Sequence, residues 1–358
     1  MVFKPEGLAT GIGSVPCTGP AEALNLIFGS LPEIPHWPQM PGKGSLEGFV
    51  FQFLTPLVRT GLIRIEDDRA YFDSESDRWG ERMADFYTIY LAAAEGDPEA
   101  LEAFSLPEES ASGFYAFLDR VKAEGSGEAL YFKGQLAGPL TVGFNLKDAR
   151  GRLAYYQDQP RDLLVKTLAM HGRWQALKLA GLGRPVIIFV DEPAVSVYGK
   201  SDYITVTREM IKGDLNEISD QIHSAGALVG VHSCDAIDWS ILYQSSLDIV
   251  NLDAYNFGDS LIPFAGDLKD YIVRGGILAL GMVPTSERAF DETSESLAKR
   301  LENIWAQMIA RGIPDQRLKE QTMITPSCGT GLLDPVLAAR IYRLTRDLST
   351  RVRESFAK

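Results

Sequence analysis

Residues 227–234 read Ala-Leu-Val-Gly-Val-His-Ser-Cys, an apolar run that ends abruptly in polar side chains. This pattern predicts a buried strand that carries its chemistry at the carboxyl end. Successive strand residues point to opposite faces, so His232 and Cys234, two positions apart, lie on the same side. Two metal-ligand side chains on one side of a strand end can reach a single ion.

A second strand end of this kind lies far downstream, where the apolar run 322–326 breaks into Ser-Cys-Gly-Thr-Gly at 327–331. Cys328 is one of only three cysteines in the chain. A free cysteine is usually a small buried hydrophobe, and that reading stays open for each residue alone. A His-x-Cys motif and a distant cysteine, each at a strand end, favour instead a shared zinc site.

Length and composition indicate an ordinary globular protein. The chain has 358 residues with 45% hydrophobic and 23% charged side chains, and α/β barrels of this size commonly form one domain, so we expect one domain over 1–358. The net charge of −13 disfavours binding to nucleic acid or to a membrane surface. The absence of a signal region, a membrane span and a disulfide framework favours a reducing, cytoplasmic setting.

Strand and helix patterns alternate along the chain. We expect eight strands, near residues 8, 63, 130, 187, 229, 249, 278 and 323. The helices are expected at 20–29, 46–59, two or three within 75–124, 160–180, 205–225, 294–311 and 335–354. The proline-rich residues 30–45 are expected to form a loop, with His36 and Trp37 either packed on the surface or part of a substrate lid.

Alternating strands and helices imply a parallel sheet, and eight strands imply closure. The predicted fold is therefore an α/β (β/α)8 TIM barrel with helical insertions. A doubly wound open sheet is the alternative, but no Gly-x-Gly-x-x-Gly follows a first strand. The polar and glycine-rich motifs all come just after strands, on the side where barrel enzymes carry their active sites.

A carboxylate from a neighbouring strand is the expected fourth metal ligand. Asp253, at the end of the run 247–252, is the best placed, and Asp235 and Asp248 are weaker candidates. A lone Asp at a strand end can equally be a helix cap. Two thiolates and a carboxylate would make an electron-rich zinc, which suits activation of a thiol better than activation of water. A purely structural zinc is the alternative.

Other strand ends supply polar groups for a substrate. Asp191, with Glu192, follows the apolar run 186–190 and could bind an ammonium group or pair with a structural Lys or Arg. Ser14, with the backbone of Ile12 and Gly13, could hold a carboxylate by hydrogen bonds.

The motifs at these strand ends, and their order along the chain, resemble those of a known family, the C-terminal catalytic barrel of cobalamin-independent methionine synthase. The residues that carry the resemblance are Ile12-Gly13-Ser14, Gly138-Pro139, Asp191-Glu192-Pro193-Ala194, His232-x-Cys234 and Pro326-Ser327-Cys328-Gly329. The resemblance spans residues 8–331. Zinc methyltransferases that act on coenzyme M, and uroporphyrinogen decarboxylase, belong to the same superfamily.

The resemblance implies a zinc-dependent methyltransferase acting on homocysteine or a similar thiol. By the same resemblance, His232, Cys234 and Cys328 fall on the family's zinc ligands, and Asp253 stands where the family usually has glutamate. Ile12, Ser14 and Asp191 fall on positions that contact homocysteine.

Two departures from the family concern the methyl donor. The folate-using enzyme has an additional N-terminal barrel, and an Asp and a His in the loop after its seventh strand, where this chain reads Gly-Met-Val-Pro-Thr-Ser-Glu at 281–287. Methylfolate needs a general acid at its leaving nitrogen, whereas methylcobalamin does not. We therefore expect a methyl donor of the methylcobalamin type, carried by a corrinoid protein partner. A uroporphyrinogen decarboxylase-like enzyme, a coenzyme M-type methyltransferase and a non-catalytic thiol-binding or corrinoid-binding protein are the alternatives.

Overall fold

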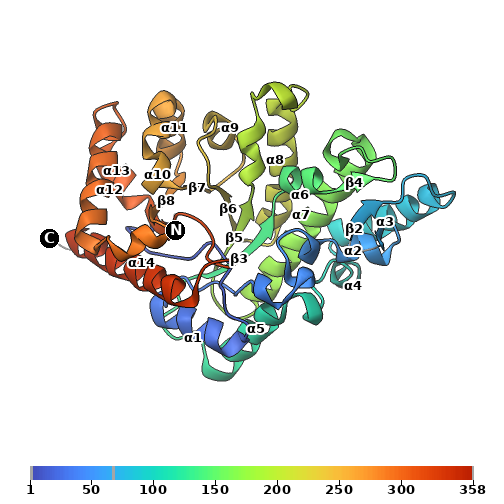
Figure 1. Cartoon of the computed structure of the whole chain (residues 1–358), viewed down its shortest axis with the longest axis horizontal. Coiled ribbons are helices and arrows are strands. Elements are labelled where there is room, and N and C mark those ends of the chain that lie inside the picture. Colours follow the sequence, from blue (N-terminus) through green and yellow to red (C-terminus); the bar gives the residue numbers. More distant parts are fainter. Residues whose placement is uncertain (1–2, 67–68, 357–358) are drawn as a thin grey trace.

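The computed structural model describes residues 3–66 and 69–356, and its centre is a six-stranded sheet (Figure 1). All neighbouring strands are parallel and follow one another in sequence order. Strands of a parallel sheet covered on both faces are buried, and every residue of these strands except Leu228 is buried. The strands are β3 (Phe132–Ala137), β5 (Val186–Asp191), β6 (Leu228–Ser233), β7 (Ile249–Leu252), β8 (Ile277–Val283) and β9 (Thr322–Pro326).

Helices follow the strands and cover the outer face of the sheet. Apolar side chains spaced three or four residues apart give each long helix a face to bury; in α12 these include Leu297, Leu301 and Met308, after a capping box between Thr293 and Ser296. The helices are α7 (Asp158–Ala180), α8 (Arg208–Ser224), α9 (Ser240–Tyr243), α10 (Ala254–Phe257), α11 (Ala265–Val273), α12 (Ser294–Ile309), α13 (Asp315–Glu320) and α14 (Pro335–Phe356).

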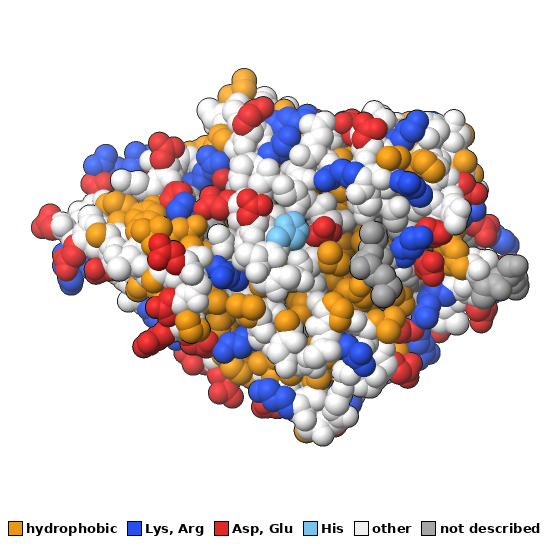
Figure 2. Space-filling view, turned by 180° about the vertical axis from the view of Figure 1, so that it is seen from behind, with side chains coloured by type: hydrophobic (Ala, Val, Ile, Leu, Met, Phe, Trp, Pro, Cys, Tyr) orange, Lys and Arg blue, Asp and Glu red, His pale blue; other side chains and the backbone are white. Residues whose placement is uncertain are grey.

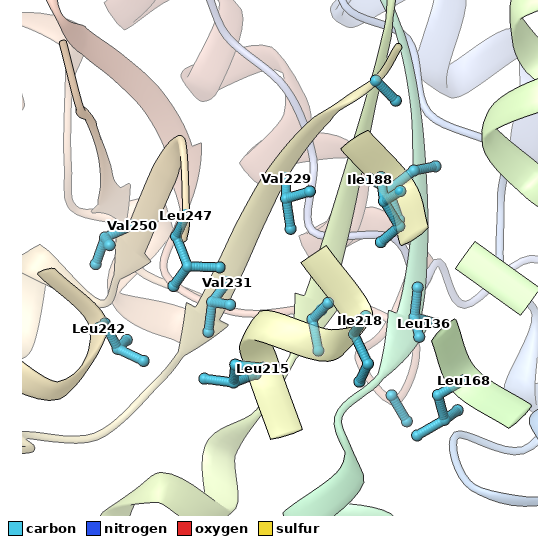
Figure 3. Close-up of a cluster of buried hydrophobic side chains, with 14 of the residues drawn as sticks. Leu136, Leu168, Ile188, Leu215, Ile218, Val229, Val231, Leu242, Leu247 and Val250 are labelled. Carbon is cyan, nitrogen blue, oxygen red and sulfur yellow. The ribbon is translucent and has the colours of Figure 1, made fainter. Parts of the chain in front are cut away.

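The two faces of the sheet bury two separate hydrophobic clusters. Ile188 and Val190 of β5 point outward into the larger cluster, which Figure 3 shows between the strands and helices α7 and α8. Ile187 and Phe189 alternate with them and point inward. The inner cluster is completed by Leu8, Ile34, Ile249, Ile277, Ala279 and Met323. A sheet with a core of its own on its inner face is curled in the manner of a TIM barrel.

Two extended N-terminal segments link the edges of this curled sheet. An isolated parallel bridge joins Ala9 to Ile324 of β9, and another joins His36 to Lys133 of β3. A third parallel bridge, from Ser14 to Gln39, joins the two segments to each other. The architecture is therefore TIM-barrel-like, with the parallel α/β organisation that the sequence predicts.

The strand predicted near residue 63 is wrong as a member of this sheet. Ile63 begins β1 (Ile63–Glu66), which pairs antiparallel with β2 (Arg69–Phe72), and β2 pairs with the short β4 (Lys147–Asp148). This three-stranded sheet lies to one side, next to α3 (Figure 1). Only the first residue of β1 is buried, so this strand has too little apolar surface for a barrel interior.

The N-terminal half of the chain supplies the remaining helices. They are α1 (Pro20–Ser30), α2 (Thr55–Arg59), α3 (Trp79–Ala94), α4 (Pro98–Glu102), α5 (Ser112–Glu124) and α6 (Pro139–Asn145). The continuous helix expected over 46–59 is instead broken into two 3-10 turns, Ser45–Glu47 and Phe51–Phe53, followed by α2.

Residues 36–39 take the place in the structure that we expected residue 63 to fill. His36 and Trp37 are fully buried, so they belong neither to a surface loop nor to a lid. His36 Nε2 lies 2.8 Å from the Tyr342 hydroxyl, and Trp37 Nε1 donates to Gln175 Oε1 at 3.0 Å. Residues that precede prolines favour extended backbone, which explains how this proline-rich segment can run beside β3.

Charged side chains of both signs are interspersed on the face shown in Figure 2, without a field of basic residues. None of the helices within residues 3–66 and 69–356 combines the length and the apolar character that crossing a bilayer requires.

Candidate metal centre and its pocket

The structure brings His232, Cys234 and Cys328 together at the carboxyl ends of β6 and β9. One ligand atom from each residue lies within 4.8 Å of the others. Zinc forms bonds of about 2.0–2.1 Å to nitrogen and about 2.3 Å to sulfur, so two such bonds span most of this separation. His232 is buried, while the two cysteines are partly exposed.

The ring of His232 is held by one nitrogen and leaves the other unpaired. Nδ1 lies 2.5 Å from Asn251 Oδ1 on the neighbouring strand β7. Nε2 is buried and has no hydrogen-bond partner among the described residues. Buried polar atoms normally have a hydrogen-bond partner. An unpaired imidazole nitrogen beside two sulfur atoms is therefore the arrangement expected of a metal-ligating histidine.

The charges of the group favour a thiolate. The neighbouring Cys328 thiol and the His232 ring lower the pKa of Cys234 to about 4. The Cys234 sulfur, together with burial, raises the pKa of Cys328. Burial opposes protonation of His232, but the Cys234 sulfur and the Asp191 carboxylate outweigh it and raise the pKa of the ring. Imidazole and thiolates are the ligands that zinc prefers, so the group could hold a metal such as zinc.

The carboxylates considered as a fourth ligand all have other partners. Asp253 caps α10, and its two oxygens accept from Asn256 N at 2.9 Å and Asn256 Nδ2 at 2.7 Å. Asp248 lies at the opposite end of the strands, where it accepts from Val229 N. Asp235 accepts from its neighbour Ala236 N. The structure thus supplies three clustered ligands, with Asp253 near them but bonded elsewhere.

A pocket of about 510 Å³ opens over the three candidate ligands. All three predicted substrate residues, Ile12, Ser14 and Asp191, line it together with the ligands. The other lining residues are Gln39, Pro41, Glu47, Phe49, Pro193, Gly329, Gly331, Leu332 and Leu333.

Two buried carboxylates line this pocket, and each has one buried oxygen without a partner among the described residues. Asp191 Oδ1 and Glu47 Oε2 make no hydrogen bond within the described part of the chain. Glu47 Oε1, by contrast, accepts from Ser112 Oγ at 2.6 Å and lies 3.1 Å from Lys43 Nζ. Burial raises the pKa of Asp191 to about 6. Glu47 was not predicted from the sequence, because it stands in a 3-10 turn without a recognisable motif.

Ser14 lies where its segment packs against the loop after β9. Its hydroxyl oxygen accepts from Gly331 N at 3.1 Å, and its carbonyl accepts from Thr330 Oγ1 at 2.9 Å. A Cβ at Gly329 would lie only 2.3 Å from Ser14 Oγ, so a larger residue there would displace the Ser14 hydroxyl. These contacts place the Ser14 hydroxyl at the pocket wall, opposite the strand that carries Asp191.

Lys133 lies inside the sheet below this segment, because the strand expected near residue 130 is β3 and continues to Ala137. Its ammonium donates to the Ile12 carbonyl at 2.6 Å and lies 4.6 Å from the centre of the Phe189 ring. Burial lowers the pKa of Lys133 to about 7. The side chain therefore supports the backbone of Ile12.

The fold and the site together define a TIM-barrel-like α/β protein with a candidate soft-ligand metal centre at its strand ends. No family model matches the chain, and no curated protein is significantly similar to it. Among solved structures it is similar to a Cellulomonas fimi endo-beta-1,4-mannanase double mutant, with 11% identity and a TM-score of 0.33 over 66% of this chain. The match covers 57% of the mannanase. A likeness this distant says nothing of substrate or reaction.

Proposed function

We propose that this protein is a zinc-dependent methyltransferase that methylates a small thiol, with homocysteine as the acceptor and methionine as the product. One observation carries the proposal. The pocket that holds His232, Cys234 and Cys328 also holds two buried carboxylates with unpaired oxygens. A metal centre that could bind a thiol, beside carboxylates that could bind an ammonium group, would suit an amino acid that carries a thiol.

The residues of the chain divide the work of binding such a substrate. A zinc ion held by His232, Cys234 and Cys328 would lower the pKa of a coordinated thiol and so supply a thiolate nucleophile. Asp191 and Glu47 would accept hydrogen bonds from the substrate ammonium. Ser14 Oγ accepts from Gly331 N, which leaves its proton available for the substrate carboxylate.

The methyl donor we propose is methylcobalamin, free or carried by a corrinoid protein. The loop after β8 supports this choice, because Thr285 is engaged with the Ser327 hydroxyl and Glu287 is exposed. Neither side chain lines the pocket, where a general acid for methylfolate would be needed. A methyl group leaving methylfolate needs a protonated nitrogen, whereas one leaving cobalt does not.

We also infer that the segments around Ala9 and His36 are the first two strands of a (β/α)8 barrel with helical insertions. Their parallel bridges to β9 and to β3 support this reading. The side chains of Leu8 and Ile34 in the inner cluster support it independently.

Methyl transfer measured directly tests the proposal. Purified protein with zinc is incubated with homocysteine and methylcobalamin, or with homocysteine and methyltetrahydrofolate, and methionine is measured by mass spectrometry. We expect methionine from the first donor and its loss in Cys234→Ala. Cys17→Ala is the matched control, because Cys17 is buried outside the pocket. Activity with the folate alone would refute the donor assignment, and no activity with either would refute the function.

The lining of the pocket also distinguishes the alternatives. No Arg or Lys of the described residues lines it, although a tetrapyrrole with many carboxylates would need such groups. This counts against a decarboxylase of the uroporphyrinogen type. Coenzyme M carries a sulfonate and no ammonium, so it would bring no hydrogen-bond donor to the unpaired oxygens of Asp191 and Glu47. Both carboxylates favour homocysteine.

A further inference from the structure

Asn251 lies behind the candidate metal centre and contacts three neighbouring strands. It is fully buried in β7 and is the register partner of His232 in β6. Its Nδ2 lies 2.8 Å from the Ala279 carbonyl oxygen in β8 and 2.8 Å from Thr325 Oγ1 in β9. Its Oδ1 lies 2.5 Å from His232 Nδ1. One amide therefore connects four consecutive strands inside the sheet.

The Ala279 carbonyl determines which way this amide points. A backbone carbonyl only accepts, so the atom of Asn251 that faces it has to be the donor Nδ2. The opposite orientation would place Oδ1 against the Ala279 oxygen and leave two buried acceptors facing each other. Oδ1 is thereby directed at His232.

An oxygen that only accepts also determines the tautomer of the histidine. His232 Nδ1 has to carry the proton that it donates to Asn251, so in the neutral ring Nε2 keeps the lone pair. Nε2 is the atom left without a partner in the described structure. The proton position of His232 is thus set by a chain of hydrogen bonds that starts at the backbone of β8.

We propose that Asn251 is the positioning residue of the metal centre: it holds His232 in the Nδ1-protonated tautomer and presents Nε2 as the ligand. Outer partners of metal-ligating histidines typically contribute about 10- to 100-fold to metal affinity. The inference rests on the zinc site of the proposed function, but it concerns the free protein as well. It would hold whatever thiol or methyl donor the protein uses.

The tautomer can be observed directly. The chain has only four histidines, so long-range proton–nitrogen NMR of the full protein with labelled histidine should resolve every ring. His232→Gln assigns the signal. In zinc-free protein at mildly alkaline pH, we expect His232 to be protonated on Nδ1 and bare on Nε2. A neutral ring protonated on Nε2 would overturn the proposal without affecting the proposed function.

Metal affinity provides the second test. Asn251→Ala should weaken zinc binding about 10- to 100-fold, measured by competition with a chromophoric chelator. Gln321→Ala is the matched control, because Gln321 is a buried amide that also donates to two backbone carbonyls, those of Ile272 and Gly276. We expect the control to lose stability and to keep its zinc affinity. Equal zinc affinity in Asn251→Ala and in the wild type would overturn the positioning role.

Discussion

Replacing Asp191 by Asn should weaken homocysteine binding through the ammonium group alone. Asp191 lines the pocket, its side chain is buried, and its Oδ1 has no hydrogen-bond partner among the described residues. A hydrogen bond to a charged group contributes about 1.5–3 kcal/mol. Since about 1.4 kcal/mol is a factor of ten, the dissociation constant should rise about 10- to 150-fold. Asn keeps the size of the side chain, so the pocket wall should not collapse.

The assay compares two ligands in two proteins. Binding of L-homocysteine and of its deamino analogue, which has the same thiol and carboxylate, is measured by calorimetry with zinc-loaded wild type and Asp191→Asn. In the wild type, homocysteine should bind more tightly than the analogue. In the variant this preference should fall by the predicted factor, while binding of the analogue should change little, because the analogue has no ammonium to lose.

Two outcomes would refute this reasoning. An equal loss of affinity for both ligands would mean that Asp191 acts on the metal or on the pocket shape, not on the ammonium. No loss for either ligand would mean that Asp191 has no contact with the substrate. Glu47→Gln provides the independent repeat, because the unpaired Glu47 oxygen belongs to a different segment of the same pocket.

Three further predictions concern stability and metal content. Asp253→Ala should cost about 1 kcal/mol as a lost helix cap but keep its zinc by elemental analysis; zinc loss would identify Asp253 as a ligand. The pKa of Lys133 is lowered from 10.5 to about 7, so between pH 7 and pH 10.5 the unfolded chain holds more protons than the folded protein. The free energy of unfolding should therefore rise with pH in this range, by up to about 1.4 kcal/mol per pH unit. Denaturant titrations should show this slope reduced in Lys133→Met; an unchanged slope would contradict the buried charge. Finally, zinc at 100 times its dissociation constant should raise the free energy of unfolding by about 2.7 kcal/mol in the wild type and in Cys17→Ala, but not in Cys328→Ala. Thermal unfolding with and without chelator measures this difference. An equal rise in all three proteins would contradict the proposed metal site.

Most central strands could be predicted because their burial leaves a clear pattern in the sequence. The run Val186–Asp191 is apolar until its last residue, and the structure forms β5 over that range. The predicted run at 322–326 coincides with β9. Parallel strands covered on both faces can give short continuous apolar runs, and the length of these runs and their polar ends distinguish them from helices.

The segment around His36 could not be recognised as extended for the opposite reason. Its prolines cannot donate to a hydrogen-bond ladder, and propensity therefore assigns it to a loop. Only the tertiary contacts, such as the bond from His36 to Tyr342, make the segment part of the interior. The strand expected near residue 63 is the converse error. It was assigned to the barrel, but only its first residue, Ile63, is buried.

The candidate metal ligands could be predicted from the regular geometry of a strand, whereas Glu47 could not be predicted. His232 and Cys234 are tied to a strand end, where the period of two determines which side chains share a face. Glu47 reaches the pocket from a 3-10 turn in an irregular loop, so no period connects it to the site. Asp253 was expected to be a ligand because it follows a strand, but the same position also begins a helix. Both of its carboxylate oxygens accept hydrogen bonds from Asn256.

The balance of charge around the pocket connects these residues to a substrate. The two candidate cysteine ligands, Asp191 and Glu47 line the pocket. Glu47 Oε1 lies 3.1 Å from Lys43 Nζ, and the buried Lys133 is turned to the Ile12 carbonyl. An anionic ligand entering this space would meet the negative charge of Asp191 and of the Cys234 thiolate, and a cation would relieve it. The ammonium of an amino acid would provide that cation, and a zinc ion would provide a second one for the sulfur atoms. Substrate and metal are therefore expected to bind with positive coupling, each lowering the cost that the buried carboxylates and thiolates impose on the folded protein.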